Sequence, residues 1–97
     1  MSDITRMVLD GEVNIYRAAE LKHSVLAALR QSRVLEIDLA GVTEFDTAGL
    51  QVLMLAKRTA SAEQRELRLL HHSPAVVEVV ELLNLGAFFG DAVLIED

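Results

Sequence analysis

Apolar and polar residues alternate with two different periods along the chain, and the changes of period predict four strands separated by three helices. Strand patterns cover residues 4–9, 34–39, 67–71 and 92–95, and apolar residues at helical spacing follow each of the first three. The strand at 34–39 starts with apolar residues at both parities, as expected for a central parallel strand covered on both faces. This order favours a largely parallel sheet with right-handed crossovers.

Local signals set the expected ends of these elements. Asp10-Gly11 indicates a turn or a strand end, and Asn14 is placed to cap the first helix. That helix has one core face, formed by Ala18, Leu21, Val25, Ala28 and Leu29. Ser73-Pro74 begins the third helix, because serine accepts at the N-cap and proline suits the first helical position. Asn84 or Gly86 can supply the left-handed residue that ends it.

The second helix, expected over residues 51–60, is unusually apolar at its start. It follows a predicted short loop over 40–45, in which Val42 and Phe45 turn inward. A one-sided surface helix has apolar residues at only three or four positions in two turns. Here five of six consecutive residues are apolar: Leu50, Val52, Leu53, Met54 and Leu55. Either neighbouring elements cover these side chains on more than one side, or some of them remain available to a partner.

The junction between this loop and the helix, Phe45 to Leu50, is the candidate working surface, because open α/β sheets bind ligands beyond the carboxyl ends of their strands. Thr47 can serve simply as the N-cap of the helix. Alternatively, its hydroxyl can carry a phosphate beside the like charge of Asp46, so that the surface changes in charge while the helix keeps its shape. Gly49 costs about 1 kcal/mol relative to alanine inside a helix, which indicates a local need such as close packing.

Composition limits the classes of partner. The 97 residues are 52% apolar and predict one compact domain over 1–97. A net charge of −6, scattered basic residues and few aromatics disfavour binding to nucleic acid or to an anionic membrane. Cysteine is absent, which fits a reducing compartment. With no signal peptide and no apolar run of about 20 residues, we expect a soluble cytoplasmic protein without membrane insertion.

The sequence gives little support for an enzyme. His71, His72 and Ser73 are adjacent, but neighbouring side chains of a strand point to opposite sides, and Ser73 already has a capping role. Asp38, Glu44 and Asp46 lie near one end of the sheet, where carboxylates are more often solvated than bound to a cation. We therefore predict no catalytic residue, no metal site and no cofactor.

Four segments carry a resemblance to a known family. They are Leu-Asp-Gly-Glu-Val at 9–13, Glu-Ile-Asp-Leu at 36–39, Val-Thr-Glu-Phe-Asp-Thr-Ala-Gly-Leu at 42–50 and Ser-Pro-Ala-Val at 73–76. In this order, and over residues 7–95, the chain resembles the STAS domain of bacterial anti-sigma factor antagonists and of the cytoplasmic tails of sulfate transporters. The resemblance implies a small α/β sandwich, with a mostly parallel sheet of four to five strands and three main helices.

The resemblance also implies a function. Thr47 matches the serine or threonine that a partner kinase, related to histidine-kinase ATPases, phosphorylates, and Asp46 matches the aspartate before it. In that family the unphosphorylated domain binds its partner, phosphorylation releases it, and a phosphatase resets the switch. The implied partners are thus an anti-sigma factor or related serine kinase, and a phosphatase, in partner switching that regulates transcription. The residues expected to contact the partner are Asn14, Asp46, Thr47, Ala48, Gly49, Leu50 and Met54.

A second function is equally compatible with the resemblance. STAS subunits of lipid-transport ATPases also carry Asp-Thr at this place, and small STAS proteins occur with chemotaxis signalling. In these complexes the domain would be an unphosphorylated subunit or scaffold. The chain departs from many family members in having Asn14 in place of an aspartate and in lacking an additional first strand and a final helix. An uncovered sheet edge invites pairing with another chain, which leaves a homodimer open.

Overall fold

A computed structural model describes residues 3–84 of the chain. The strand predicted at 92–95 and the candidate helix end at Gly86 lie outside the described residues. Within them, strands and helices alternate: β1 (Ile4–Val13), α1 (Ala18–Leu29), β2 (Val34–Phe45), α2 (Thr47–Ala62), β3 (Glu66–Leu70) and α3 (Pro74–Leu82). The predicted order of elements is confirmed over this range.

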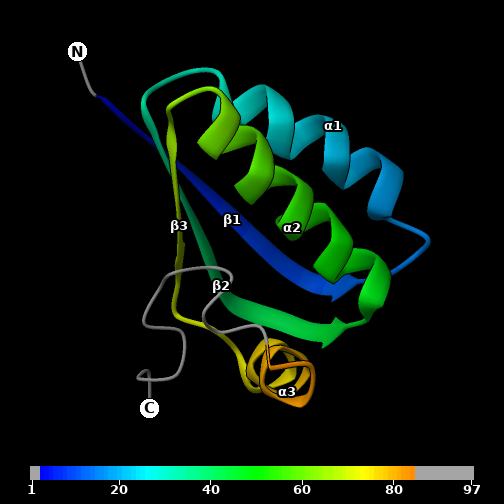
Figure 1. Ribbon diagram of the computed structural model, residues 1–97. Helices are drawn as coiled ribbons and strands as arrows, with labels where there is room; N and C mark the ends of the chain where they lie inside the picture. Colours follow the sequence, from blue (N-terminus) through cyan, green and yellow to red (C-terminus); the bar gives the residue numbers. More distant parts are fainter. Residues whose placement is uncertain (1–2, 85–97) are drawn as a thin grey trace.

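The three strands form a parallel sheet in the order β1-β2-β3, with β2 in the centre. Figure 1 shows α1 and α2 side by side on one face of the sheet, while α3 lies beside the curved far end of β2. Because α1 and α2 each follow a parallel strand, both helices begin at the same edge of the sheet. The carboxyl ends of β1 and β2 therefore meet the amino ends of α1 and α2.

The core lies between the sheet and these two helices. Alternate residues of β2 are fully buried, and they pack in one cluster with the apolar faces of α1 and α2. Burying a side chain of this size contributes about 1.5–3 kcal/mol. The members from these elements are Leu35, Ile37 and Leu39 of β2, Leu21, Val25 and Leu29 of α1, and Leu53, Ala56 and Ala60 of α2.

The apolar start of α2 is explained by this packing. Leu50, Val52 and Leu53 are buried, because α2 is covered by the sheet on one side and by α1 on another. Met54 and Leu55 are half-buried. Of the two alternatives for this apolar stretch, coverage by neighbouring elements is therefore the correct one for Leu50, Val52 and Leu53.

Two predicted boundaries were wrong, and one structural feature accounts for both. Residues 40–45 belong to β2 rather than to a loop, and β1 continues through Asp10-Gly11 to Val13. Gly11 remains in the strand with φ +72°, a value that favours glycine. The pairing slips at this point, from Val8 opposite Asp38 to Asp10 opposite Gly41, which inserts an extra residue into β2. Val42 and Phe45 are buried, as predicted.

The end signals of α3 were predicted correctly. The hydroxyl of Ser73 accepts from the N–H of Val76 at 3.3 Å, Pro74 is the first helical residue, and Asn84 is left-handed with φ 56°. Over residues 3–84, the longest helices are too short or too polar to cross a bilayer.

Candidate functional site

The start of α2 is organised by the side chain of Asp46. This residue follows β2 directly and has the extended backbone of an N-cap. Its Oδ1 accepts from the N–H groups of Ala48 at 3.0 Å and Gly49 at 3.1 Å. The N-cap is therefore Asp46, and the prediction that Thr47 has this role was wrong by one residue. Two donors that a helix start leaves without intrahelical partners are satisfied by one carboxylate.

The same carboxylate holds the loop between β1 and α1. Its Oδ2 accepts from the N–H of Ile15 at 3.2 Å, and the N–H of Asp46 donates to the carbonyl of Val13 at 3.3 Å. Two segments separated by about thirty residues are thus joined at one point. The start of α2 and the loop before α1 form a single surface.

Thr47 lies on this surface with an exposed side chain, as the first residue of α2. Within residues 3–84, its hydroxyl makes no hydrogen bond. Since Asp46 supplies the cap, capping no longer explains why a threonine stands at this position. A hydroxyl that faces solvent at a helix start is accessible to an enzyme that modifies it.

Gly49 permits the close approach of α2 to the sheet. A Cβ atom at this position would lie 2.8 Å from the carbonyl oxygen of Val13, 2.8 Å from its Cγ1 and 3.1 Å from Cε1 of Phe45. These distances are shorter than ordinary van der Waals contact, and one of them involves backbone. Close packing is therefore the local need that the sequence indicated for this glycine.

Asn14 positions the loop from inside. It is 8% exposed, its Oδ1 accepts from the N–H of Tyr16 at 3.0 Å, and its Nδ2 donates to Oε2 of Glu44 at 3.5 Å. The predicted cap of α1 by Asn14 was wrong, because α1 begins later, at Ala18, after an N-cap residue, Arg17, whose side chain does not cap it. Asn14 instead forms an Asx-turn, in which its side-chain oxygen accepts from the backbone N–H of Tyr16.

Arg17 braces the end of β1. Its Nη1 donates to the carbonyl oxygens of Asp10 at 2.8 Å and Glu12 at 2.7 Å. A guanidinium group suits this role because its donors are held in a rigid plane. The strand around Gly11 is therefore fixed against the base of the loop.

Ile15 and Tyr16 are the residues that the sequence reasoning missed. Their side chains are 67% and 91% exposed, although both are large and Tyr16 is the only tyrosine of the chain. Their backbone N–H groups are bound by Asp46 and Asn14. In the sequence, Ile15 and Tyr16 stand out as two large side chains shortly after the end of a strand. Their exposure depends on the conformation of the loop, which hydrophobic periodicity does not predict. Tyrosine is among the residues that most often anchor protein interfaces.

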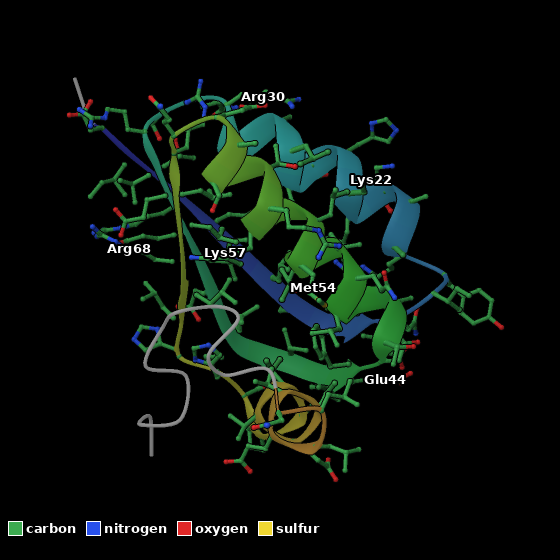
Figure 2. All side chains as sticks on the ribbon, viewed as in Figure 1. Lys22, Arg30, Glu44, Met54, Lys57 and Arg68 are labelled. Atoms are coloured by element: carbon green, nitrogen blue, oxygen red, sulfur yellow. The ribbon has the colours of Figure 1, made fainter. Side chains whose placement is uncertain are left out.

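The remaining predicted contact residues are either partly exposed or buried. Ala48, at the first turn of α2, and Met54, which packs against the core, are partly exposed. Gly49 and Leu50 are buried beneath the surface. Figure 2 shows Met54 along α2 and Glu44 at the curved end of β2, next to the start of that helix. Glu44 and Asp46 make the surroundings of Thr47 acidic.

Two of the groups considered for catalysis or metal binding, His71 and Asp38, lie side by side. His71 Nδ1 is 3.1 Å from Asp38 Oδ2 and is exposed, whereas His72 is buried. The backbone N–H of Ala40 and the His71 side chain hold the pKa of Asp38 below its usual value. No group of three potential metal ligands occurs in the described part of the chain.

Comparisons with known proteins agree with this geometry. A family model described as "Mlab, STAS domain" matches residues 2–96. No curated protein matches the sequence significantly. Among solved structures, that of the anti-sigma factor antagonist SpoIIAA in its unphosphorylated form superposes with a TM-score of 0.74 at 21% sequence identity. The match covers 93% of this chain and 80% of the SpoIIAA chain. At this identity the likeness establishes the fold, which is α/β with three helices and a parallel sheet.

Proposed function

Because the chain belongs to the STAS domain family, we propose that it is a regulatory protein-binding module of the anti-sigma factor antagonist type, switched by phosphorylation of Thr47. One observation carries the proposal: the hydroxyl of Thr47 is exposed at the start of α2, and Asp46 rather than Thr47 caps the helix. The module itself has no catalytic role, and it acts in the cytoplasm, where a kinase has access to ATP.

The partner surface in this proposal consists of Thr47, Ala48, Ile15 and Tyr16. These residues are at least partly exposed and are held together through Asp46. Asn14, Gly49 and Leu50 support the surface without projecting from it. An ordered loop that presents a tyrosine loses little conformational freedom when a partner covers it, which favours affinity.

Phosphorylation would act on charge rather than on shape. A phosphate adds about −1.5 to −2 charges next to Asp46 and Glu44. The N–H groups of Ala48 and Gly49 already donate to Asp46, so the helix start does not need to rearrange. A partner packed on this surface would meet a desolvated negative charge, and each 1.4 kcal/mol of penalty lowers affinity about tenfold. The partner would be an anti-sigma factor or a related serine kinase, and a phosphatase would restore binding.

The experiment has two stages. The intact mass of the protein isolated from its own cells should include a form heavier by one phosphoryl group, which is absent from the Thr47→Ala variant. The partner is then captured by p-benzoylphenylalanine placed at Tyr16, with and without Thr47→Glu. We expect Thr47→Glu to remove the cross-link. A phosphate that persists in Thr47→Ala, or a cross-link that is unchanged in Thr47→Glu, would refute the switch.

A second candidate function is a constitutive subunit or scaffold of a lipid-transport ATPase or a chemotaxis-associated complex. Two adjacent large side chains, Ile15 and Tyr16, are exposed on one loop, and such a pair is suited to a lasting interface with another subunit. In that case the protein would copurify in a stable assembly, and no phosphorylated form would be found.

A further inference from the structure

A groove between α1 and α2 opens next to the proposed partner surface. It has a volume of about 480 Å³. Its walls near the helix starts are formed by Ala18, Ala19 and Ala48. Lys22 lies one turn further along α1, and Arg58 lies at the far end on α2. Ala48 directly follows Thr47, so the groove is continuous with the switch residue. Gln51, Val52 and Leu55 complete the lining.

The groove follows α2 for almost three turns and α1 for one. From Ala48 to Arg58 it runs along α2 for ten residues, which corresponds to about 15 Å. On α1 its lining runs from Ala18 to Lys22. Alanine walls allow a close approach of backbones, and Leu55 provides apolar contact, whereas Val52 is largely buried. Amphipathic helices bind in grooves of this kind through an apolar face.

The two cationic side chains of the lining specify the occupant further. Lys22 and Arg58 are both exposed on a protein whose net charge is −6, and within the described residues Lys22 has no ion-pair partner. Covering a lysine with an apolar partner would remove its hydration without compensation, whereas a carboxylate would compensate it. We infer that the groove binds an acidic amphipathic helix of the partner, with carboxylates facing Lys22 and Arg58.

This inference rests on the proposed function and gives it a physical basis. An acidic helix that starts or ends beside Ala48 would lie within a few residues of Thr47. A phosphate on Thr47 would then repel the carboxylates at the near end of that helix. Attraction by the groove and repulsion by the phosphate would act on one segment of the partner, so a single modification would oppose its binding.

The test places p-benzoylphenylalanine at Gln51, an exposed and already long side chain of the groove lining, in the full chain expressed in its own cells. The cross-linked peptide of the partner is identified by mass spectrometry and should contain acidic residues at helical spacing. The double variant Lys22→Glu/Arg58→Glu should lower the cross-link yield about tenfold or more, because it replaces attraction by repulsion. Thermal unfolding of the variant, whose changed side chains are exposed, establishes that it folds.

A matched control carries the same change of net charge elsewhere. Figure 2 shows Lys22 on α1 and Lys57 on the opposite flank of α2, toward β3, and Lys57 does not line the groove. The control Arg33→Glu/Lys57→Glu should leave the yield within about twofold, because neither side chain lines the groove and salt weakens interactions between separated surface charges.

The outcomes separate the groove from the switch. A cross-linked segment that is not acidic, or an equal yield in the charge-reversed variant, overturns the inference. If the probe at Gln51 captures nothing while the probe at Tyr16 captures a partner that Thr47→Glu releases, the groove is refuted and the proposed function stands. If the Tyr16 cross-link is indifferent to Thr47→Glu, the proposed function fails whatever occurs at Gln51.

Discussion

At the scale of single residues, Asp46 and Thr47 divide two roles that the sequence alone assigned to one side chain. The carboxylate of Asp46 accepts from three backbone N–H groups, while the hydroxyl of Thr47 faces solvent. In the proposed switch, structure and regulation therefore depend on different residues, which allows them to be separated by mutation.

Asp46→Ala should lower the free energy of unfolding by about 1–2 kcal/mol, because it removes a helix cap and the anchor of the β1–α1 loop. Thr47→Ala should change it by less than about 0.5 kcal/mol, as for other surface substitutions. Urea denaturation of both variants measures the difference. Equal losses would mean that Thr47 also contributes to the cap.

Gly49→Ala should destabilise the protein by about 1–3 kcal/mol, although alanine is the better helix former. The reason is the 2.8 Å approach of the new Cβ to the carbonyl oxygen of Val13. Ser61→Ala, at an exposed position of the same helix, is the control and should be neutral or slightly stabilising. A neutral Gly49→Ala would show that α2 can move away from β1 at little cost.

At the scale of elements, one row of charged side chains crosses all three strands. Arg6, Glu36 and Arg68 occupy the same lateral row of the sheet, and Glu36 accepts from Arg6 Nε at 2.9 Å and from Arg68 Nη1 at 3.2 Å. The hydrogen bond from Arg6, followed by that from Arg68, lowers the pKa of Glu36 against the opposing effect of burial. The row thus stabilises the pairing of β1 and β3 with β2.

This lowered pKa predicts a stability difference that depends on pH. A carboxylate with a depressed pKa in the folded state contributes stability above its unfolded pKa, about 4.3, and loses that contribution as the pH falls through its folded pKa. Wild type should therefore be more stable than Glu36→Gln at pH 7, and the difference should shrink below about pH 4. Urea titrations at both pH values measure it. Glu78→Gln, on the exposed face of α3, should show no such change.

The elements also show where sequence reasoning succeeds. Alternation in 34–39 and the Ser73-Pro74 signal predicted β2 and the start of α3, because both depend on local chemistry. The extension of β2 through Ala40 and Gly41 depends instead on pairing with β1 around Gly11, which no local pattern contains. At the site, the sequence identified the junction but not the cap, since Asp46 and Thr47 are both good capping residues. Tyr16 was missed because its exposure is a property of the folded loop.

At the scale of the whole molecule, the starts of α1 and α2 and the ends of β1 and β2 are gathered at one edge, and the β1–α1 loop lies there too (Figure 1). This loop carries the exposed side chains of Ile15 and Tyr16. This edge combines a modifiable hydroxyl, an exposed tyrosine and acidic neighbours. The rest of the described fold holds that edge in place.

Tyr16→Ala should therefore leave the unfolding free energy within about 0.5 kcal/mol of wild type, because the side chain is 91% exposed. Partner affinity should fall at least about tenfold, as is common for an interfacial tyrosine. Titration with the partner captured by cross-linking measures the affinity. Leu83→Ala, at an exposed apolar position after α3, should leave affinity unchanged. Unchanged affinity in Tyr16→Ala would place the interface elsewhere.

The carboxylate of Asp46 has one more consequence, for motion. Because a single side chain accepts from the amides of Ile15, Ala48 and Gly49, a motion of that side chain frees all three amides together. If exchange proceeds through this motion, the hydrogen-exchange rates of the three amides should rise and fall together. A bound partner that touches only the loop would then slow exchange in the first turn of α2 as well.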